Sequence, residues 1–205
     1  MRLVAQINAG NTADLIEGCI AHHRSLGVDA FVILHIHSDD NTPDLLRELE
    51  NKATDITVIY GKPENIFNQV GQRQAVDVAR SVAKADWIIR VDCDERWFAR
   101  EGSLKAAFEK RSEKSSIIIP RYNVVWPTPE AIGQAESSPL LLEQLNLVLF
   151  PVAPPTPVPG QDTLNGIPWV LTQIAPKSAM RGLAGLYFSQ GGHAVVGGHD
   201  PESPN

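Results

Sequence analysis

The chain has few of the features that mark extracellular, membrane-spanning or nucleic-acid-binding proteins. Its 205 residues include two cysteines, Cys19 and Cys93, which are too few for a disulfide framework and favour a reducing compartment. No apolar run approaches the ~20 residues that span a bilayer. Polar residues follow Met1 too soon for the apolar core of a signal peptide. The formal charge of -6 disfavours nucleic acid as a partner. We therefore expect either a cytoplasmic protein or one that is peripheral to the inner face of a membrane.

The first two-thirds of the sequence alternates strand and helix patterns. Apolar runs typical of strands occupy Leu3–Ile7, Ala30–Leu34, Ile56–Tyr60 and Trp87–Val91. Helices are expected between them: one from about Thr12 with Asn11 as its cap, one opening at Thr42-Pro43, and one over Ile66–Lys84. This βαβαβαβ order predicts an α/β fold with a mostly parallel central sheet and helices on both faces.

The pattern changes after Glu95, where a short helix over Ser103–Lys110 and a strand over Ser116–Arg121 are expected. Residues 127–175 are rich in proline, which neither a helix nor a central strand accommodates. We predict one domain with three parts: an α/β half over residues 1–126, an irregular excursion over 127–175, and a C-terminal segment over 176–205 that returns to the first half. Two apolar stretches of the excursion, Leu140–Leu142 and Leu147–Phe150, either pack on the sheet or meet a partner or a lipid surface.

Two carboxylates follow the fourth predicted strand, in Asp92-Cys93-Asp94-Glu95. Ligands bind at the carboxyl ends of strands in open α/β sheets. Side chains two positions apart in an extended segment point to the same side, so Asp92 and Asp94 would converge on one point. Their oxygens suit a hard divalent cation and the phosphates that it carries. The alternative is an acidic turn without a ligand.

Five short motifs in this order resemble those of bacterial family-2-type glycosyltransferases with the GT-A fold. The similarity runs over about residues 3–126 and 176–195. The motifs are His22-His23-Arg24-Ser25-Leu26-Gly27-Val28-Asp29, Ser38-Asp39-Asp40-Asn41-Thr42, Ala85-Asp86-Trp87-Ile88 leading to Asp92-Cys93-Asp94-Glu95, Pro120-Arg121-Tyr122-Asn123, and Gly191-Gly192-His193-Ala194-Val195. The resemblance implies a GT-A-like fold with a Rossmann-like nucleotide-binding half.

The resemblance also implies roles for individual residues in binding a nucleotide-sugar donor. Asp92 and Asp94 would hold Mn²⁺ or Mg²⁺ against the donor's diphosphate, with His193 as a third ligand that favours manganese. The other expected roles are contact with the nucleotide base for Gln6 through Asn8, and a place in the nucleotide site for His35, where many family members carry an acidic residue. The resemblance also implies a sugar-ring floor for Trp97 and Phe98. From the residues themselves, Arg73 either binds a phosphate or Asp92, which its guanidinium suits equally, or lies on a solvated helix face. Glu95 is expected to orient the ligands, and Asp40 to order its loop and cap the helix at Thr42 in place of contacting substrate.

The implied activity is metal-dependent transfer of a sugar to a hydroxyl acceptor, a saccharide or glycan precursor, with inversion. No motif identifies the general base, for which Glu130, Glu136, Glu143 and Asp162 are available. One alternative is a catalytically degenerate domain that binds a nucleotide or a protein partner. Another is a phosphatase of the haloacid-dehalogenase type, which carries its DxD on the first strand and attacks phosphorus with the first aspartate.

Overall fold

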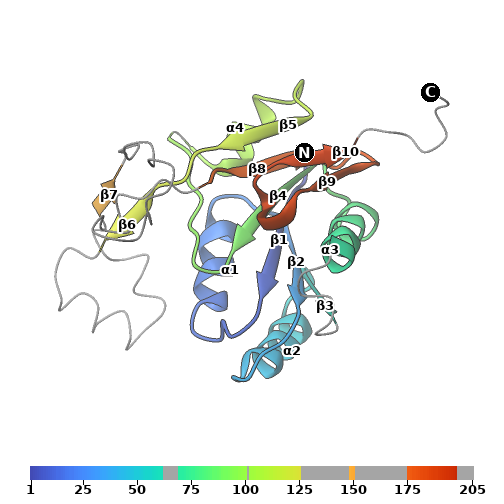
Figure 1. The fold of residues 1–205 in the computed structure, drawn as a ribbon, viewed down its shortest axis with the longest axis vertical. Helices are drawn as coiled ribbons and strands as arrows, with labels where there is room; N and C mark the ends of the chain where they lie inside the picture. Colours follow the sequence, from blue (N-terminus) through green and yellow to red (C-terminus); the bar gives the residue numbers. More distant parts are fainter. Residues whose placement is uncertain (62–68, 101, 126–147, 151–174, 198–205) are drawn as a thin grey trace, which may run out of the picture. The chain divides into compact units, whose positions relative to one another are not determined.

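The computed structural model describes residues 1–61, 69–100, 102–125, 148–150 and 175–197 (Figure 1). The chain divides into two compact units, Met1–Ile118 with Lys177–Asn205, and Ile119–Pro176. In the second unit, β6 (Asn123–Val125) pairs antiparallel with β7 (Val148–Phe150). Most of the predicted proline-rich excursion, including Leu140–Leu142, lies outside the described residues.

The first unit is built on a six-stranded sheet in the order β3-β2-β1-β4-β8-β5. Its four parallel strands are β1 (Leu3–Ala9), β2 (Ala30–His35), β3 (Ile56–Tyr60) and β4 (Trp87–Asp92). The strand β8 (Lys177–Arg181) runs antiparallel to β4, and β5 (Ser116–Ile119) forms the far edge. The predicted mostly parallel sheet is therefore confirmed.

Helices cover both faces of this sheet (Figure 1). Alternate strand residues such as Val4, Val32 and Ile88 pack with α3 (Gln69–Ser81) on one face. The hairpin of β9 (Leu186–Phe188) and β10 (Val195–Gly197) joins the same cluster. The other face carries α1 (Ile16–Ser25), α2 (Thr42–Lys52) and α4 (Leu104–Glu109). There the rings of Trp87 and Phe108 lie 5.0 Å apart, so each face has its own apolar layer.

The first helix starts later than predicted, at Ile16 instead of about Thr12, and Asn11 does not cap it. Asn11 has a φ of 51°, the left-handed conformation, whereas a capping residue needs an extended backbone. Residues 12–15 form a turn in which the N–H of Leu15 donates to the Thr12 carbonyl at 3.0 Å. The helix predicted over Ile66–Lys84 is described from Gln69 onward.

The other predicted helices begin close to where the sequence places them. The Ser103 hydroxyl caps α4 by accepting the N–H of Ala106 at 3.2 Å. In α2, Pro43 occupies the first turn as expected. Within the part of the chain that the structure describes, every helix is too short or too polar to cross a bilayer.

Candidate functional site

The sheet reverses its strand order at β1, and the candidate site lies at that reversal. From β1 the chain proceeds to β2 and β3 on one side and then crosses to β4 on the other side. Asn8 and Asp92, at the carboxyl ends of β1 and β4, are register partners. Ligands of open α/β sheets bind at such a switch point, outside the carboxyl ends of the strands.

A pocket of about 560 Å³ opens at these strand ends. Its lining comes from the ends of β1, β2 and β4 and the loops that follow them: Asn8, Ala9, Gly10, Asn11, Thr12, Leu15, Ile36, His37, Asp92, Cys93 and Asp94. Gly10 brings two of these loops together, because a Cβ at this position would lie 2.8 Å from the His37 carbonyl oxygen. A side chain here would force the pocket walls apart.

Asp92 and Asp94 both reach the pocket, but through a turn and not through the extended segment that the sequence suggested. Strand β4 ends at Asp92, and the N–H of Glu95 donates to the Asp92 carbonyl at 2.9 Å. Glu95 also accepts the N–H of Asp92 at 3.2 Å, so its carboxylate stabilises the turn. The chain can bend here because the last sheet pairing of β4 is Asn8 with Asp92.

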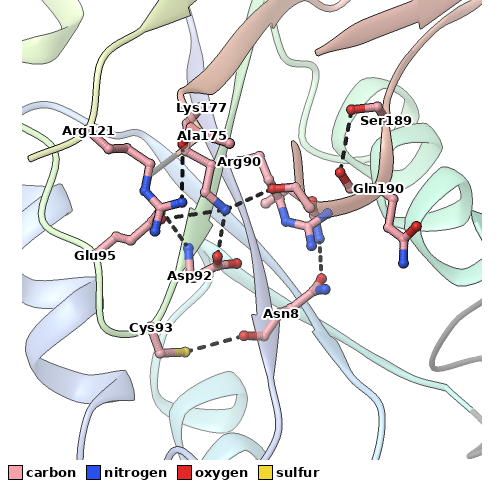
Figure 2. Close-up of polar contacts among 12 residues, drawn as sticks. Asn8, Arg90, Asp92, Cys93, Glu95, Arg121, Ala175, Lys177, Ser189 and Gln190 are labelled. Atoms are coloured by element: carbon pink, nitrogen blue, oxygen red, sulfur yellow. Dashed lines mark hydrogen bonds and ion pairs between the residues drawn. The ribbon is translucent and has the colours of Figure 1, made fainter. Parts of the chain in front are cut away.

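Cys93, between the two aspartates, links the end of β4 to β1 (Figure 2). Its thiol donates to the Asn8 carbonyl at 3.4 Å. Burial raises the pKa of the Cys93 thiol to about 12, and the neighbouring Asp92 and Asp94 carboxylates act in the same direction. The thiol therefore stays protonated and is a structural donor, not a nucleophile.

Lys177, the first residue of β8, forms an ion pair with Asp92 that the sequence analysis did not predict (Figure 2). Its Nζ lies 2.5 Å from Asp92 Oδ2, 2.9 Å from the Gly191 carbonyl oxygen and 3.5 Å from Glu95 Oε1. The side chain of Lys177 is 1% exposed and that of Asp92 is 40% exposed. The ammonium therefore lies beneath the carboxylate, and the carboxylate remains accessible from the pocket.

Arg90 is a second buried cation behind the carboxylates. It lies two positions before Asp92 on the same face of β4, is 2% exposed, and donates to Gln72 Oε1 of α3 at 3.3 Å. Burial lowers the pKa of the guanidinium, and the Asp92 and Glu95 carboxylates oppose that shift. A charged residue inside an otherwise apolar strand was the sequence signal that could have identified it.

The donor set of the pocket fits a divalent cation that shares its coordination with phosphate oxygens. Mg²⁺ commonly binds through one or two carboxylates plus phosphates and water, and Asp92 and Asp94 provide two carboxylates at the pocket. The donor set of the pocket does not fit a cation whose ligands all come from the protein. Among the described residues, no three His, Cys, Asp or Glu side chains are grouped so that they could hold a metal.

Of the predicted nucleotide-binding residues, Asn8 lines the pocket and Gln6 lies beneath it. Gln6 is 0% exposed and donates from Nε2 to Asn8 Oδ1 at 2.9 Å, so it orients the Asn8 side chain. His35 is also buried, with Nε2 3.1 Å from the Ser38 hydroxyl, and its neighbour His37 lines the pocket. Burial lowers the pKa of His35 and so favours its neutral form.

Arg73 and His193 lie on elements next to the site and are not part of the pocket lining. Arg73 is on the exposed side of α3, with its guanidinium carbon 5.2 Å from the centre of the Tyr187 ring. His193 follows the short 3-10 helix η4 (Gln190–Gly192) and precedes β10, at a turn before a strand as predicted. Its role as a third metal ligand stays a prediction, because the described residues form no three-ligand group. His199, which the sequence offers as a weaker substitute for His193, lies outside the described residues.

Trp97 and Phe98 occupy different environments, and the predicted sugar floor is therefore divided. Trp97 is 7% exposed, whereas Phe98 is 53% exposed. The backbone of Trp97 is held by α1: its N–H donates to His23 Nε2 at 3.3 Å, and its carbonyl lies 2.7 Å from His22 Nε2. Two histidines of the motif that begins at His22 thus anchor the segment after the carboxylates, a role that the sequence analysis did not assign.

Comparison with known proteins yields similar solved structures at low identity. No protein-family model matches the chain, and no curated protein matches it. TarS from S. aureus is 16% identical with a TM-score of 0.38, over 58% of this chain and 21% of that one. TarS 1-349 is 20% identical with a TM-score of 0.39, over 58% of this chain and 35% of that one. It has also been solved in complex with UDP and with UDP-GlcNAc.

The 4-diphosphocytidyl-2C-methyl-D-erythritol synthase from Anaerococcus prevotii is also similar. It is 10% identical with a TM-score of 0.46, over 88% of this chain and 70% of that one. Against the TarS structures, this chain spans about a fifth to a third of the other chain's length. Because these TM-scores are all low, the similarity carries no argument about function.

Proposed function

We propose that this chain is a GT-A-type glycosyltransferase. It moves a sugar from a nucleotide-diphosphate donor to a hydroxyl group of a saccharide or glycan precursor, with inversion. One observation carries the proposal: Asp92 and Asp94 share a pocket with the carboxyl end of β1, at the point where the strand order of the sheet reverses. Carboxylates at that position suit a ligand that arrives with a cation and phosphates.

The chain's own residues supply the nucleotide contacts. Asn8, oriented by Gln6, and the loop from Gly10 to Thr12 offer amide and backbone groups that can read a base edge or a ribose. Asp92 and Asp94 would hold Mn²⁺ or Mg²⁺, with His193 proposed to complete the ligands. When bound there, the cation supplies positive charge to the departing diphosphate. Glu95 keeps the turn that presents both aspartates.

Direct displacement at the sugar carbon also needs a carboxylate that accepts the proton of the acceptor hydroxyl. The sequence offers Glu130, Glu136, Glu143 and Asp162, all of which lie outside the described residues. Each is a candidate for substitution once an acceptor is found.

A catalytically degenerate nucleotide-binding domain is the second candidate function, and the Lys177–Asp92 ion pair favours it. A carboxylate that already has a buried counter-ion is less available to a metal than a free one. Binding without turnover distinguishes this function from the first. A domain of this kind would bind a nucleotide sugar but release no nucleoside diphosphate with any acceptor.

A panel of nucleotide sugars, tested with and without Mn²⁺ by thermal unfolding, tests the proposal directly. A ligand at about 100 times its Kd stabilises the folded state by roughly 2.7 kcal/mol. In a chain of this size that corresponds to a rise in Tm of roughly 5 to 10 °C. Release of nucleoside diphosphate from the stabilising donor is then measured with sugar acceptors.

We expect Asp94→Asn to remove the Mn²⁺-dependent part of the shift, because its carboxylate lines the pocket and is exposed. Asp44→Asn, at an exposed position in the first turn of α2, is the matched control and should keep the full shift. An Asp94→Asn protein with an undiminished manganese effect would rule out the ligand assignment. A panel in which no nucleotide sugar raises Tm would rule out the donor class.

A further inference from the structure

The ammonium group of Lys177 is buried among oxygen atoms. Its Nζ donates hydrogen bonds to Asp92 Oδ2 at 2.5 Å and to the Gly191 carbonyl at 2.9 Å, and it forms an ion pair with Glu95 Oε1 at 3.5 Å. Three oxygens thus surround the ammonium group, and the side chain is 1% exposed. The position of the positive charge is thereby set by the fold, since β8 pairs antiparallel with β4 and begins at Lys177.

Two buried cations already neighbour Asp92. Lys177 and Arg90 are buried cations, and Asp92 and Glu95 are the carboxylates beside them. Buried charges are stable only when they are paired, so this arrangement accounts for two cations in the interior. A divalent cation at Asp92 would add two positive charges next to Lys177, which already occupies one oxygen of the carboxylate.

We infer that Lys177 is a built-in counter-ion that lowers the affinity of Asp92 and Asp94 for a divalent cation, so that the carboxylates alone do not retain one. The inference rests on the proposed function, in which the donor's diphosphate supplies the remaining ligands and the negative charge. Lys177 is thus a positioning residue: it holds the carboxylate in place and makes cation binding depend on the donor. Two carboxylates at the pocket, without a three-ligand group in the described part of the chain, fit that dependence.

The sign of the effect follows from charge. A unit positive charge about 5 Å from a divalent cation weakens binding roughly tenfold or more, even at the dielectric constant of water. Removing Lys177 should therefore tighten the binding of a metal, whereas removal of an ordinary structural residue should weaken it or leave it unchanged.

Binding of Mn²⁺ alone to the purified full chain, followed by the electron paramagnetic resonance signal of the free ion, tests this inference. We expect Lys177→Met to lower the Kd for Mn²⁺ at least about tenfold relative to the unaltered protein. Lys177→Arg keeps the charge and should keep the weak affinity. Adding Asp92→Asn to Lys177→Met should abolish the increase in affinity for Mn²⁺. A Lys177→Met protein that binds Mn²⁺ no more tightly than the unaltered one overturns the inference.

Circular dichroism shows whether Lys177→Met folds. If it does not fold, a second comparison, between two variants that both lack the Glu95 charge, tests the same inference. The double variant Lys177→Met/Glu95→Gln removes one charge of each sign and is compared with Glu95→Gln. The double variant should bind Mn²⁺ more tightly, and equal affinities overturn the inference. If nucleotide sugars bind and react but the variants with and without Lys177 bind Mn²⁺ equally well, only the role of Lys177 is wrong. If loss of Lys177 raises the affinity for Mn²⁺ but no nucleotide sugar binds, the proposed function is wrong.

Discussion

At the scale of single residues, Gly192 shows how closely the backbone approaches the buried charges of the site. Its φ is 74°, in the left-handed region, and a Cβ there would lie 2.4 Å from Cγ of Arg90. The preceding residue, Gly191, provides the carbonyl that binds Lys177. The two glycines therefore allow the turn after β9 to close over both cations.

Gly192→Ala should destabilise the fold by roughly 2 to 4 kcal/mol, because strain in the left-handed conformation adds to the displacement of Arg90. Gly102→Ala is the matched control: its φ is 67°, but no atom lies within 4 Å of the added methyl group. It should lose only about 1 kcal/mol. Urea unfolding of both variants measures the difference, and equal losses would show that contact with Arg90 contributes nothing.

At the scale of elements, Asp40 joins the start of α2 to the loop that forms the pocket wall. Its carboxylate accepts the N–H of Thr42 at 3.0 Å and the N–H of Ala13 at 3.2 Å. The hydrogen bonds to Thr42 lower the pKa of Asp40, and that to Ala13 adds to the effect. The loop-ordering role predicted for Asp40 is confirmed, and its carboxylate accepts the N–H of Thr42, although the N-cap position of α2 is Asn41.

Asp40→Ala should cost about 1 kcal/mol, because the N–H groups of Thr42 and Ala13 lose their acceptor. It should also weaken donor binding, since the loop after β1 loses one of its attachments. Asp39→Ala is the comparison, because that carboxylate is exposed and pairs with the exposed His37. Chemical unfolding and donor titration of both variants are the measurements, and the prediction fails if they behave alike.

At the scale of the whole molecule, His23 joins the α1 layer to the segment after β4. Its Nδ1 donates to the Cys19 carbonyl at 2.8 Å, and its Nε2 accepts the N–H of Trp97 at 3.3 Å. Both bonds need the neutral ring with the proton on Nδ1, since a second proton would face the Trp97 donor. Burial, which dominates, lowers the pKa of His23 to about 4.

The folded protein should therefore lose stability as the pH falls from about 6.5 to about 4. In that window the unfolded chain takes up a proton at His23 and the folded chain does not, so the free energy of unfolding decreases by up to roughly 3 kcal/mol. Above about pH 6.5 this contribution is fully present. Urea unfolding at several pH values gives the free energy of unfolding as a function of pH. Between about pH 6.5 and pH 4 this free energy should fall less steeply in His23→Gln than in the control His37→Gln. Identical slopes would contradict the assignment.

The order of strands and helices could be read from the sequence because it depends on short-range patterns. Apolar runs such as Ala30–Leu34 form a strand whichever neighbours they acquire, and Thr42-Pro43 is a local start signal. The predicted start of α1 was wrong because the Asn11 side chain makes a different contact. Its side chain accepts the N–H of Asp39 from a loop 28 positions away.

That two carboxylates follow a buried strand could be predicted from local sequence alone, because a strand and its end are properties of neighbouring residues. The groups that surround these carboxylates are brought there by the fold. Lys177 is 85 positions from Asp92 in the chain, and His23 is 74 positions from Trp97. Such contacts depend on which strands become neighbours in the sheet and which helix packs on each face. Those arrangements are set by the burial of apolar surface over the whole unit, and no local pattern encodes them.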